Sequence, residues 1–156
     1  MTNMLRIETN MDVVVNKVAM QMSALDIDRM TRLQATTLMA LMRKRIHVEG
    51  LASDGRPIGT YTKYYAEKTR PKFGRKEGNK VVLSLTRSME QGMILFPIAQ
   101  GTAIGYATPE LFQRAKWQEK RPAYGARSIF SPTESERLII AEVGRSFIKD
   151  TFGKEV

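Results

Sequence analysis

The stretch from Asp54 to Phe130 constrains the fold of this chain more than any other feature, because its composition differs from the helical sequence on either side. Two runs within it, Met93 to Ile98 and Thr102 to Ala107, flank Gln100-Gly101. Their β-branched and aromatic residues are typical of the two strands of a hairpin. Pro97 has no N–H to donate, so the first strand is expected at a sheet edge or a bulge. The sequence therefore predicts a small antiparallel sheet.

Two helices are predicted before this stretch, after a short strand-like segment at Met4 to Glu8. The first covers Met11 to Met22, where apolar residues recur at helical spacing. The second begins after Asp26, which can cap it, and its apolar stripe continues to its end near His47. Gly50 is expected to terminate it.

Two more helices are predicted after the hairpin. Thr108 can cap a helix over Glu110 to Lys120. The last helix is predicted to have Ser131 as its cap and Glu134 three residues later, which together make a capping box. This helix must pack on the core or on a neighbour, because its apolar face is wide. That face contains Leu138, Ile139, Ile140, Val143, Phe147 and Ile148.

These elements predict one α+β domain over residues 1–156. A chain of 156 residues with 42% hydrophobic residues is long enough to bury a modest core. We expect two N-terminal helices and the C-terminal helix to pack on a small antiparallel sheet, with a long basic loop inside the domain.

The long basic loop is predicted at Arg56 to Lys80, where much of the net charge of +9 is concentrated. Its glycines and prolines favour a mobile loop over a helix with a basic face. Its interleaved tyrosines allow two interpretations: they stack on nucleic-acid bases, or they pack on the core while the lysines stay solvated. An acidic protein surface or another polyanion is the expected partner. The candidate contact residues are Lys63, Lys68, Arg70, Lys72, Arg75 and Lys76.

Catalytic chemistry is not expected, because the required residue types are scarce. The chain has no cysteine and one histidine, His47, which is predicted to be a polar helix terminus. Clustered carboxylates occur only at helix starts, where acids complement the helix dipole, so neither a metal nor a cofactor is expected. No leader pattern and no apolar run of about 18 residues occurs, so we expect cytoplasmic synthesis and no membrane span.

The order of motifs resembles one family of viral assembly proteins, the virion morphogenesis or tail completion proteins of tailed bacteriophages. The run Asp54 to Lys68 is similar to that family's Asp-Gly, aromatic, Ser/Thr, Tyr and Lys series. The run Leu83 to Met89 resembles its Leu-x-x-Thr-Gly-x-Leu turn, although the glycine is missing.

The resemblance continues toward the C-terminus. Gly105-Tyr106-Ala107, followed by Phe112-Gln113 and Arg121, is similar to the family's Tyr-Ala, His-Gln and Arg series, with Phe112 in place of the histidine. Ile129 to Glu136 resembles its apolar-Ser-x-x-acid start of a final helix. Together the matches extend over residues 25 to 150.

The resemblance implies a structural protein of the virion neck, assembled in the host cytoplasm as a closed ring that joins the portal to the tail. The implied partners are copies of itself, the portal, adjacent neck or tail proteins, and DNA passing through the lumen. Two alternatives stay open: a small basic DNA-binding or packaging accessory protein, and a nuclease with converging acidic metal ligands. Candidate subunit-interface residues are Met93, Leu95, Phe96, Ile104, Tyr106, Phe147 and Phe152.

Overall fold

The structure is a computed structural model that describes residues 26–75, 78–83, 86–99, 101–121, 124–125 and 127–153. The predicted α+β class is confirmed. The predicted strand at Met4 to Glu8 and helix at Met11 to Met22 lie outside the described residues. The elements are α2 (Ile27–Lys44), α3 (Ser88–Gln91), β1 (Met93–Ile98), β2 (Gly101–Tyr106), α4 (Pro109–Glu119) and α5 (Glu134–Phe152).

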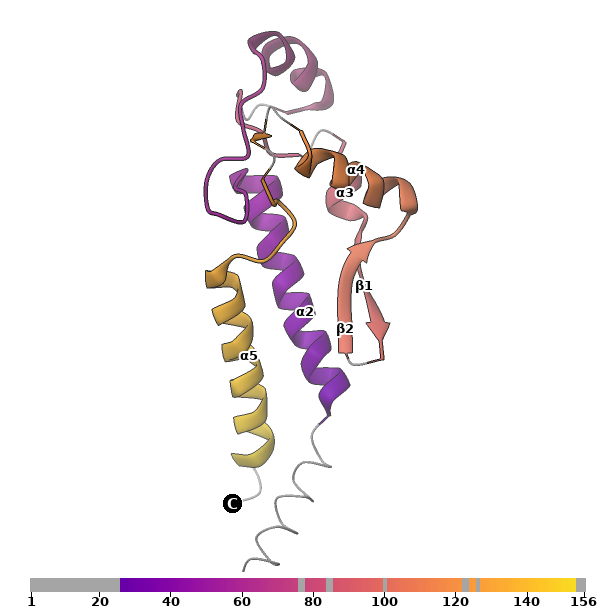
Figure 1. The fold of residues 1–156 in the computed structure, drawn as a ribbon, viewed down its shortest axis with the longest axis vertical. Helices are drawn as coiled ribbons and strands as arrows, with labels where there is room; N and C mark the ends of the chain where they lie inside the picture. Colours follow the sequence, from indigo (N-terminus) through magenta and orange to yellow (C-terminus); the bar gives the residue numbers. More distant parts are fainter. Residues whose placement is uncertain are drawn as a thin grey trace, which may run out of the picture.

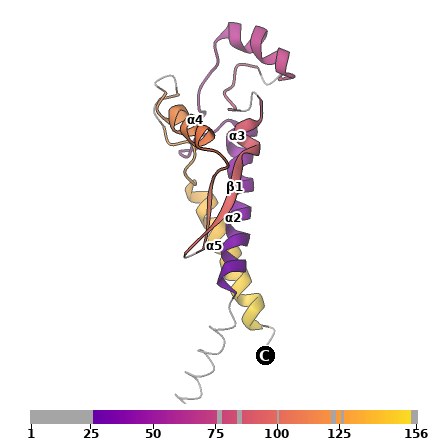
Figure 2. The ribbon, with the colours of Figure 1, turned by 90° about the vertical axis from the view of Figure 1, so that its right-hand side faces the viewer.

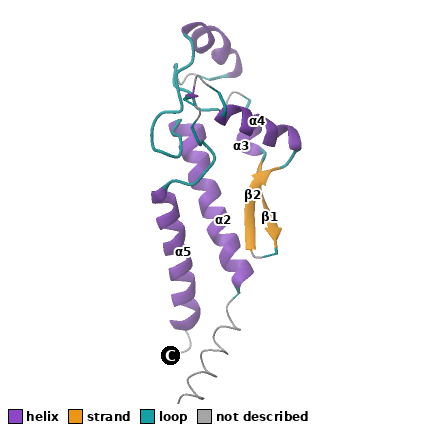
Figure 3. Cartoon of the chain, viewed as in Figure 1, coloured by secondary structure: helices purple, strands orange, loops and turns teal. Residues whose placement is uncertain are grey.

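Helix α2 runs through the middle of the molecule, and other elements pack on two sides of it (Figure 1). Helix α5 lies antiparallel along one side, and the β1–β2 hairpin lies along the other. Helix α4 crosses the end of the hairpin near α3. The turned view shows the same elongated arrangement, and the loops gather at the end opposite the C-terminus (Figure 2, Figure 3).

Helix α2 begins and ends where local signals predict. Asp26 Oδ1 accepts a hydrogen bond from the backbone N–H of Arg29 at 2.8 Å, as an N-cap does. After Lys44 the helix widens into a π-helical turn, Arg45–Glu49, which ends at Gly50 with a left-handed φ of 63°. Glycine adopts this conformation without a side-chain penalty, so the chain turns sharply there.

The hairpin confirms the predicted strands to within one residue. Strand β1 pairs with β2 from Met93 opposite Tyr106 to Ile98 opposite Gly101. Strand β2 therefore begins and ends one residue earlier than predicted. Gly101 lies against Thr31 of α2, where a Cβ would come within 3.2 Å of the threonine methyl. This close approach holds the turn end of the hairpin on α2.

Helix α5 begins two residues later than its predicted cap. Thr133, rather than Ser131, is the N-cap, and Glu136 completes the capping box. The hydroxyl of Ser131 instead accepts a hydrogen bond from Ser128 at 2.7 Å. Ser131 and Thr133 both precede an acid at capping-box spacing, so the sequence pattern alone did not separate them.

The basic segment is not a loop throughout, so that prediction is wrong for its centre. Two short helices, Tyr65–Thr69 and Arg70–Phe73, follow one another there, and they form the far end of the molecule (Figure 1). The Thr62 hydroxyl accepts a hydrogen bond from the backbone N–H of Tyr65 at 3.3 Å. Gly74, with φ of 70°, terminates the second helix. Pro71 lies in the first turn of the second helix and Gly74 directly after its last residue, and both positions tolerate these residues.

The core lies where the end of α2 meets the loops and the start of β1. Ile46, Val81 and Ile129 are fully buried, although they are distant in sequence. Most stability of so small a core comes from apolar area removed from water, about 25 cal/mol per Å². The other members of this cluster are Met42, Ala52, Ile58, Met93 and Tyr124.

Candidate interaction surfaces

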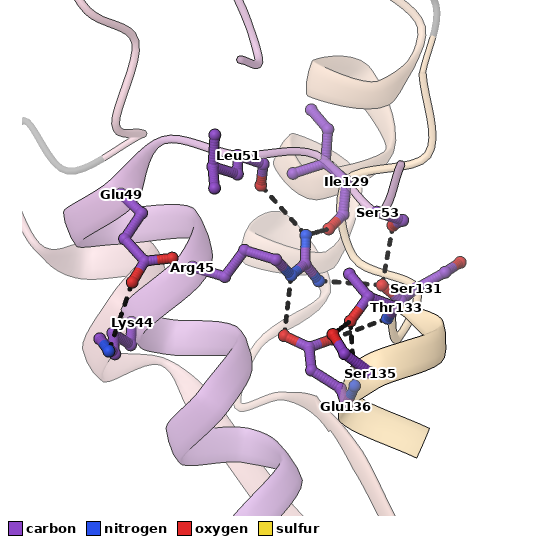
Figure 4. A network of polar contacts seen from close by, with 10 residues as sticks. All are labelled: Lys44, Arg45, Glu49, Leu51, Ser53, Ile129, Ser131, Thr133, Ser135 and Glu136. Atoms are coloured by element: carbon purple, nitrogen blue, oxygen red, sulfur yellow. Dashed lines mark hydrogen bonds and ion pairs between the residues drawn. The ribbon is translucent and has the colours of Figure 1, made fainter. Parts of the chain in front are cut away.

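A buried ion pair joins the end of α2 to the start of α5. Arg45 Nε donates to Glu136 Oε1 at 2.8 Å, and both side chains are about 7% exposed. The other guanidinium nitrogens donate to the backbone oxygens of Leu51, Ile129 and Ser131 at 2.9–3.0 Å. Figure 4 shows how this one side chain joins the end of α2, two loops and the start of α5.

Glu136 has a second partner, which links the ion pair to the helix cap. Its Oε2 accepts the backbone N–H of Thr133 at 2.8 Å, and the Thr133 hydroxyl accepts the N–H of Glu136 at 3.1 Å. Both carboxylate oxygens are therefore used. The capping box of α5 and the ion pair to α2 therefore share one carboxylate (Figure 4).

The loop before α5 is held by a second carboxylate. Glu119 Oε1, at the end of α4, accepts the backbone N–H groups of Ile129 at 2.8 Å and Phe130 at 3.0 Å. These two backbone N–H groups therefore have hydrogen-bond partners although this loop is not part of a β-sheet. This contact ties α4 to the loop that Arg45 also holds.

His47 lies in the last turn of the π-helical segment, at the helix end as predicted, but it is buried, which the sequence did not indicate. Its side chain packs beneath Val82 and Leu83 and is 5% exposed as a residue. Burial lowers the pKa of the imidazole, although Glu90 and the backbone of Leu83 and Val82 favour the charged form. Arg43 lowers the pKa further. His47 is therefore a neutral core residue.

The first apolar groove, of about 410 Å³, runs along α2 between the hairpin and α5. Ala35, Leu38 and Met42 of α2 form its floor. Ile98 and Ile104 of the hairpin form one wall, and Ile98 is 52% exposed. The remaining lining comes from Thr31, Gln34, Met93, Thr102, Gly105, Tyr106, Phe130, Pro132 and Ile140.

The second apolar groove, of about 430 Å³, lies on the other side of the α2–α5 contact. Leu33 and Thr37 of α2 face Ile139 and Val143 of α5 across it. Leu33 precedes Ala35 by two residues, so the two side chains point about 200° apart around α2. The two grooves are therefore different faces of one subunit. Ser146, Phe147, Glu142 and Asp150 complete the second lining.

A third recess, which we call the arginine pocket, is larger, at about 880 Å³. Helix α4 contributes Arg114 and Gln118, which are four residues apart and lie on one helical face. Arg121, two residues after the end of α4, also lines the recess. Arg87, the N-cap residue of α3, lines it as well. No carboxylate occurs among the described residues of this lining. The rest of the lining is Thr60, Tyr61, Thr62, Tyr65, Leu83, Thr86, Ser88, Met89 and Tyr124.

The tyrosines of the arginine pocket already have neighbours on their rings. Arg70 lies over the Tyr61 ring at 4.6 Å, and Tyr65 packs against Tyr61 with ring centroids 5.0 Å apart. Arg121 covers Tyr124 at 5.4 Å and donates to its hydroxyl at 3.0 Å. Burial raises the pKa of the Tyr61 phenol, so it remains a hydrogen-bond donor at neutral pH.

The predicted polyanion contacts are only partly accessible. Lys63, Lys68 and Lys72 are exposed on and beside the two short helices, whereas Arg75 is half-buried. Arg70 is fully buried, so its prediction as a contact residue is wrong. It packs on Tyr61, because a guanidinium stacks readily on an aromatic face. Lys76 lies outside the described residues.

The predicted subunit-interface residues separate into three groups. Met93 is a core residue at 3% exposure, and the small exposed part of it lines the first groove. Its position faces α2 because side chains alternate along β1. Phe96 is exposed on the hairpin, and Leu95 is half-buried. Ile104 and Tyr106 are half-buried and line the first groove. Phe147 lines the second groove, and Phe152 is half-buried at the end of α5.

The arginine pocket was not predicted from the sequence. Arg87 comes from one segment of the chain and Arg114 and Arg121 from another, and no local pattern links the two segments. One sequence signal could have pointed to Arg87: it stands where the resembled family has a glycine. Its φ of 60° is left-handed, a conformation that glycine would favour.

Within the described part of the chain, no group of three or more acidic or histidine side chains could hold a metal ion. None of the helices there is long and apolar enough to cross a membrane. Compared with known proteins, this chain matches no protein-family model, no curated protein and no solved structure, so the support for a function comes from these surfaces.

Proposed function

We propose that this chain is a structural protein of a tailed-bacteriophage neck, and that it works as one subunit of a closed ring between portal and tail. The observation that carries the proposal is the pair of apolar grooves on different faces of one elongated subunit. Contacts between two different faces are heterologous, and such contacts generate rings when the rotation closes.

The exposed apolar side chains support association through these faces. Leu33 and Ile139, beside the second groove, are 46% and 44% exposed. Ile98 and Phe96 extend from the hairpin at 52% and 41%. Contiguous exposed apolar residues of this kind mark contact sites, because burial against a partner removes them from water.

The hairpin supports the same proposal. A two-stranded sheet has an unpaired edge on each strand, and β1 and β2 pair only with each other among the described residues. Unpaired edges are templates for a neighbouring chain. The order of sequence motifs, which resembles that of phage tail completion proteins, supports the proposal that this association occurs at the neck of a virion.

The test uses the absence of native cysteine. Ile98→Cys labels the first groove and Leu33→Cys the second, and both positions are exposed enough to accept the change. A short bismaleimide should cross-link the double variant into a series of covalent oligomers, and the largest of them should contain as many subunits as the ring. An equal mixture of the two single variants should stop at dimers, since each copy carries one reactive face.

Lys149→Cys, on the exposed surface of α5, paired with Ile98→Cys is the matched control and should give no such series of oligomers. Cross-linked dimers from one single variant alone would indicate a two-fold interface and would overturn the ring. Imaging of the virion neck then tests the location. Density for this chain elsewhere in the particle would contradict it.

A second candidate function, as a DNA-binding or packaging accessory protein, is favoured by one observation. Lys63, Lys68 and Lys72 are exposed at one end of the molecule. Replacing all three with glutamine should abolish duplex DNA binding if DNA is the ligand, and binding by the unaltered chain should fall steeply with added salt. Under the ring proposal, the triple variant should instead impair joining of particles while DNA binding is negligible.

A further inference from the structure

We infer that the arginine pocket binds an acidic peptide segment of a partner protein through the carboxylates of its side chains. Arg87, Arg114 and Arg121 line a recess of about 880 Å³, and none of the described residues that line it is a carboxylate. A recess of this size accommodates several side chains. This inference does not depend on ring formation.

Within the described part of the chain, the carboxylate that interacts with Arg114 is that of Glu110, which is fully exposed and does not line the pocket. No ion pair is formed there by Arg87. Glu119, two residues before Arg121, accepts the backbone N–H groups of Ile129 and Phe130. Guanidinium groups present paired N–H donors that match a carboxylate, so an acidic side chain completes the site.

The backbone at Arg87 is an independent observation. Its φ of 60° lies in the left-handed region, which costs a residue with a Cβ about 1 kcal/mol relative to glycine. Strain of this kind persists where a side chain has a use that glycine cannot supply. Here the strained residue lines the same pocket as Arg114.

The aromatic rings favour a peptide over nucleic acid. Single-stranded nucleic acid binds through bases that stack on open aromatic faces. In this pocket Arg70 covers Tyr61, and Arg121 covers Tyr124, which is 5% exposed. The apolar side chains of Leu83 and Met89 also line the recess, and they suit aliphatic portions of a peptide.

The test is calorimetric titration of the intact chain at low salt with three probes: a hexaglutamate peptide, a thymidine oligonucleotide and a short DNA duplex. We expect the peptide to bind more tightly than either nucleic acid. Fluorescence of Trp117, the single tryptophan of the sequence, on the same helix as Arg114, provides a second signal. Tighter binding of either nucleic acid, or no binding of the peptide, would overturn the inference.

Two variants locate the site. Arg87→Gly removes a guanidinium and relieves the strained backbone, so it should weaken peptide binding about tenfold while thermal stability is kept or raised. Arg114→Gln should weaken binding similarly. Lys116→Gln removes the same charge from α4, but its ammonium lies over Phe112 at 4.5 Å, so binding should change less than about twofold. Equal losses in all three variants would show a diffuse charge effect and refute the pocket.

Discussion

Replacing Glu136 with glutamine tests whether one carboxylate holds α2, α5 and the intervening loops together. Both carboxylate oxygens accept hydrogen bonds, one from Arg45 and one from the backbone of Thr133. An amide has only one oxygen, so its NH₂ must face one of these two donors. Glu136→Gln therefore breaks one hydrogen bond and leaves the buried Arg45 charge without its counter-ion.

The size of the effect follows from the burial of the pair. Both side chains are 7% exposed, and removal of one partner of a buried ion pair costs roughly 3–5 kcal/mol. With a urea slope of about 2 kcal/mol per molar, the unfolding midpoint should fall by roughly 1.5–2.5 M. Circular dichroism at increasing urea concentration measures this midpoint.

Glu142→Gln is the matched control on the same helix. Glu142 pairs with Arg145 at 2.8 Å, but both side chains are 65% exposed, so the loss should stay below about 1 kcal/mol. A double-mutant cycle with Arg45→Met isolates the coupling between the buried partners. If Glu136→Gln costs no more than Glu142→Gln, the reasoning that this carboxylate organises the fold is refuted.

Three further predictions concern His47, Gly50 and Tyr106. Because burial lowers the pKa of His47 below its usual 6.5, the unfolded chain binds the proton more readily. The contribution of His47 to the free energy of unfolding should therefore be fully present above pH 6.5 and should fall as the pH is lowered. His47→Leu should make the free energy of unfolding, measured by urea titration at several pH values, depend less on pH. A pH dependence unchanged by the substitution would contradict this prediction. Gly50→Ala strains a left-handed φ and drives its Cβ into the Val81 carbonyl, whereas Gly55→Ala strains a similar φ in open space. Thermal unfolding should show a loss above about 2 kcal/mol for the first and about 1 kcal/mol for the second, and equal losses would exclude the clash. The Tyr106 hydroxyl is buried without a hydrogen-bond partner among the described residues, so Tyr106→Phe should leave stability unchanged or raise it by up to about 1 kcal/mol, and a clear loss in calorimetry would show a hidden partner.

Local signals predicted the elements of this fold well. Asp26 and Thr108 were identified as caps because a cap needs only the next three residues. The hairpin was found because strand and turn residues are adjacent in sequence. The cap of α5 was misplaced because the choice between Ser131 and Thr133 depends on Arg45, which binds Glu136 from 91 residues away.

Long-range packing also explains the other errors. Arg70 was predicted as a partner contact from its charge, but Tyr61 buries its guanidinium. His47 lies at a helix end, as predicted, but the sequence did not indicate that the Val82–Leu83 segment covers it. The arginine pocket combines residues from α3, α4 and the loops, and sequence spacing does not show which of these converge. Local rules therefore identify elements, whereas surfaces depend on how the elements meet.

Native mass spectrometry of the purified chain tests the ring proposal most directly, because it counts the subunits of each assembly. Association through the two grooves on different faces predicts one closed oligomer of three or more copies, with no population of larger open chains. A chain that stays monomeric as its concentration rises, or that stops at dimers, would contradict the account.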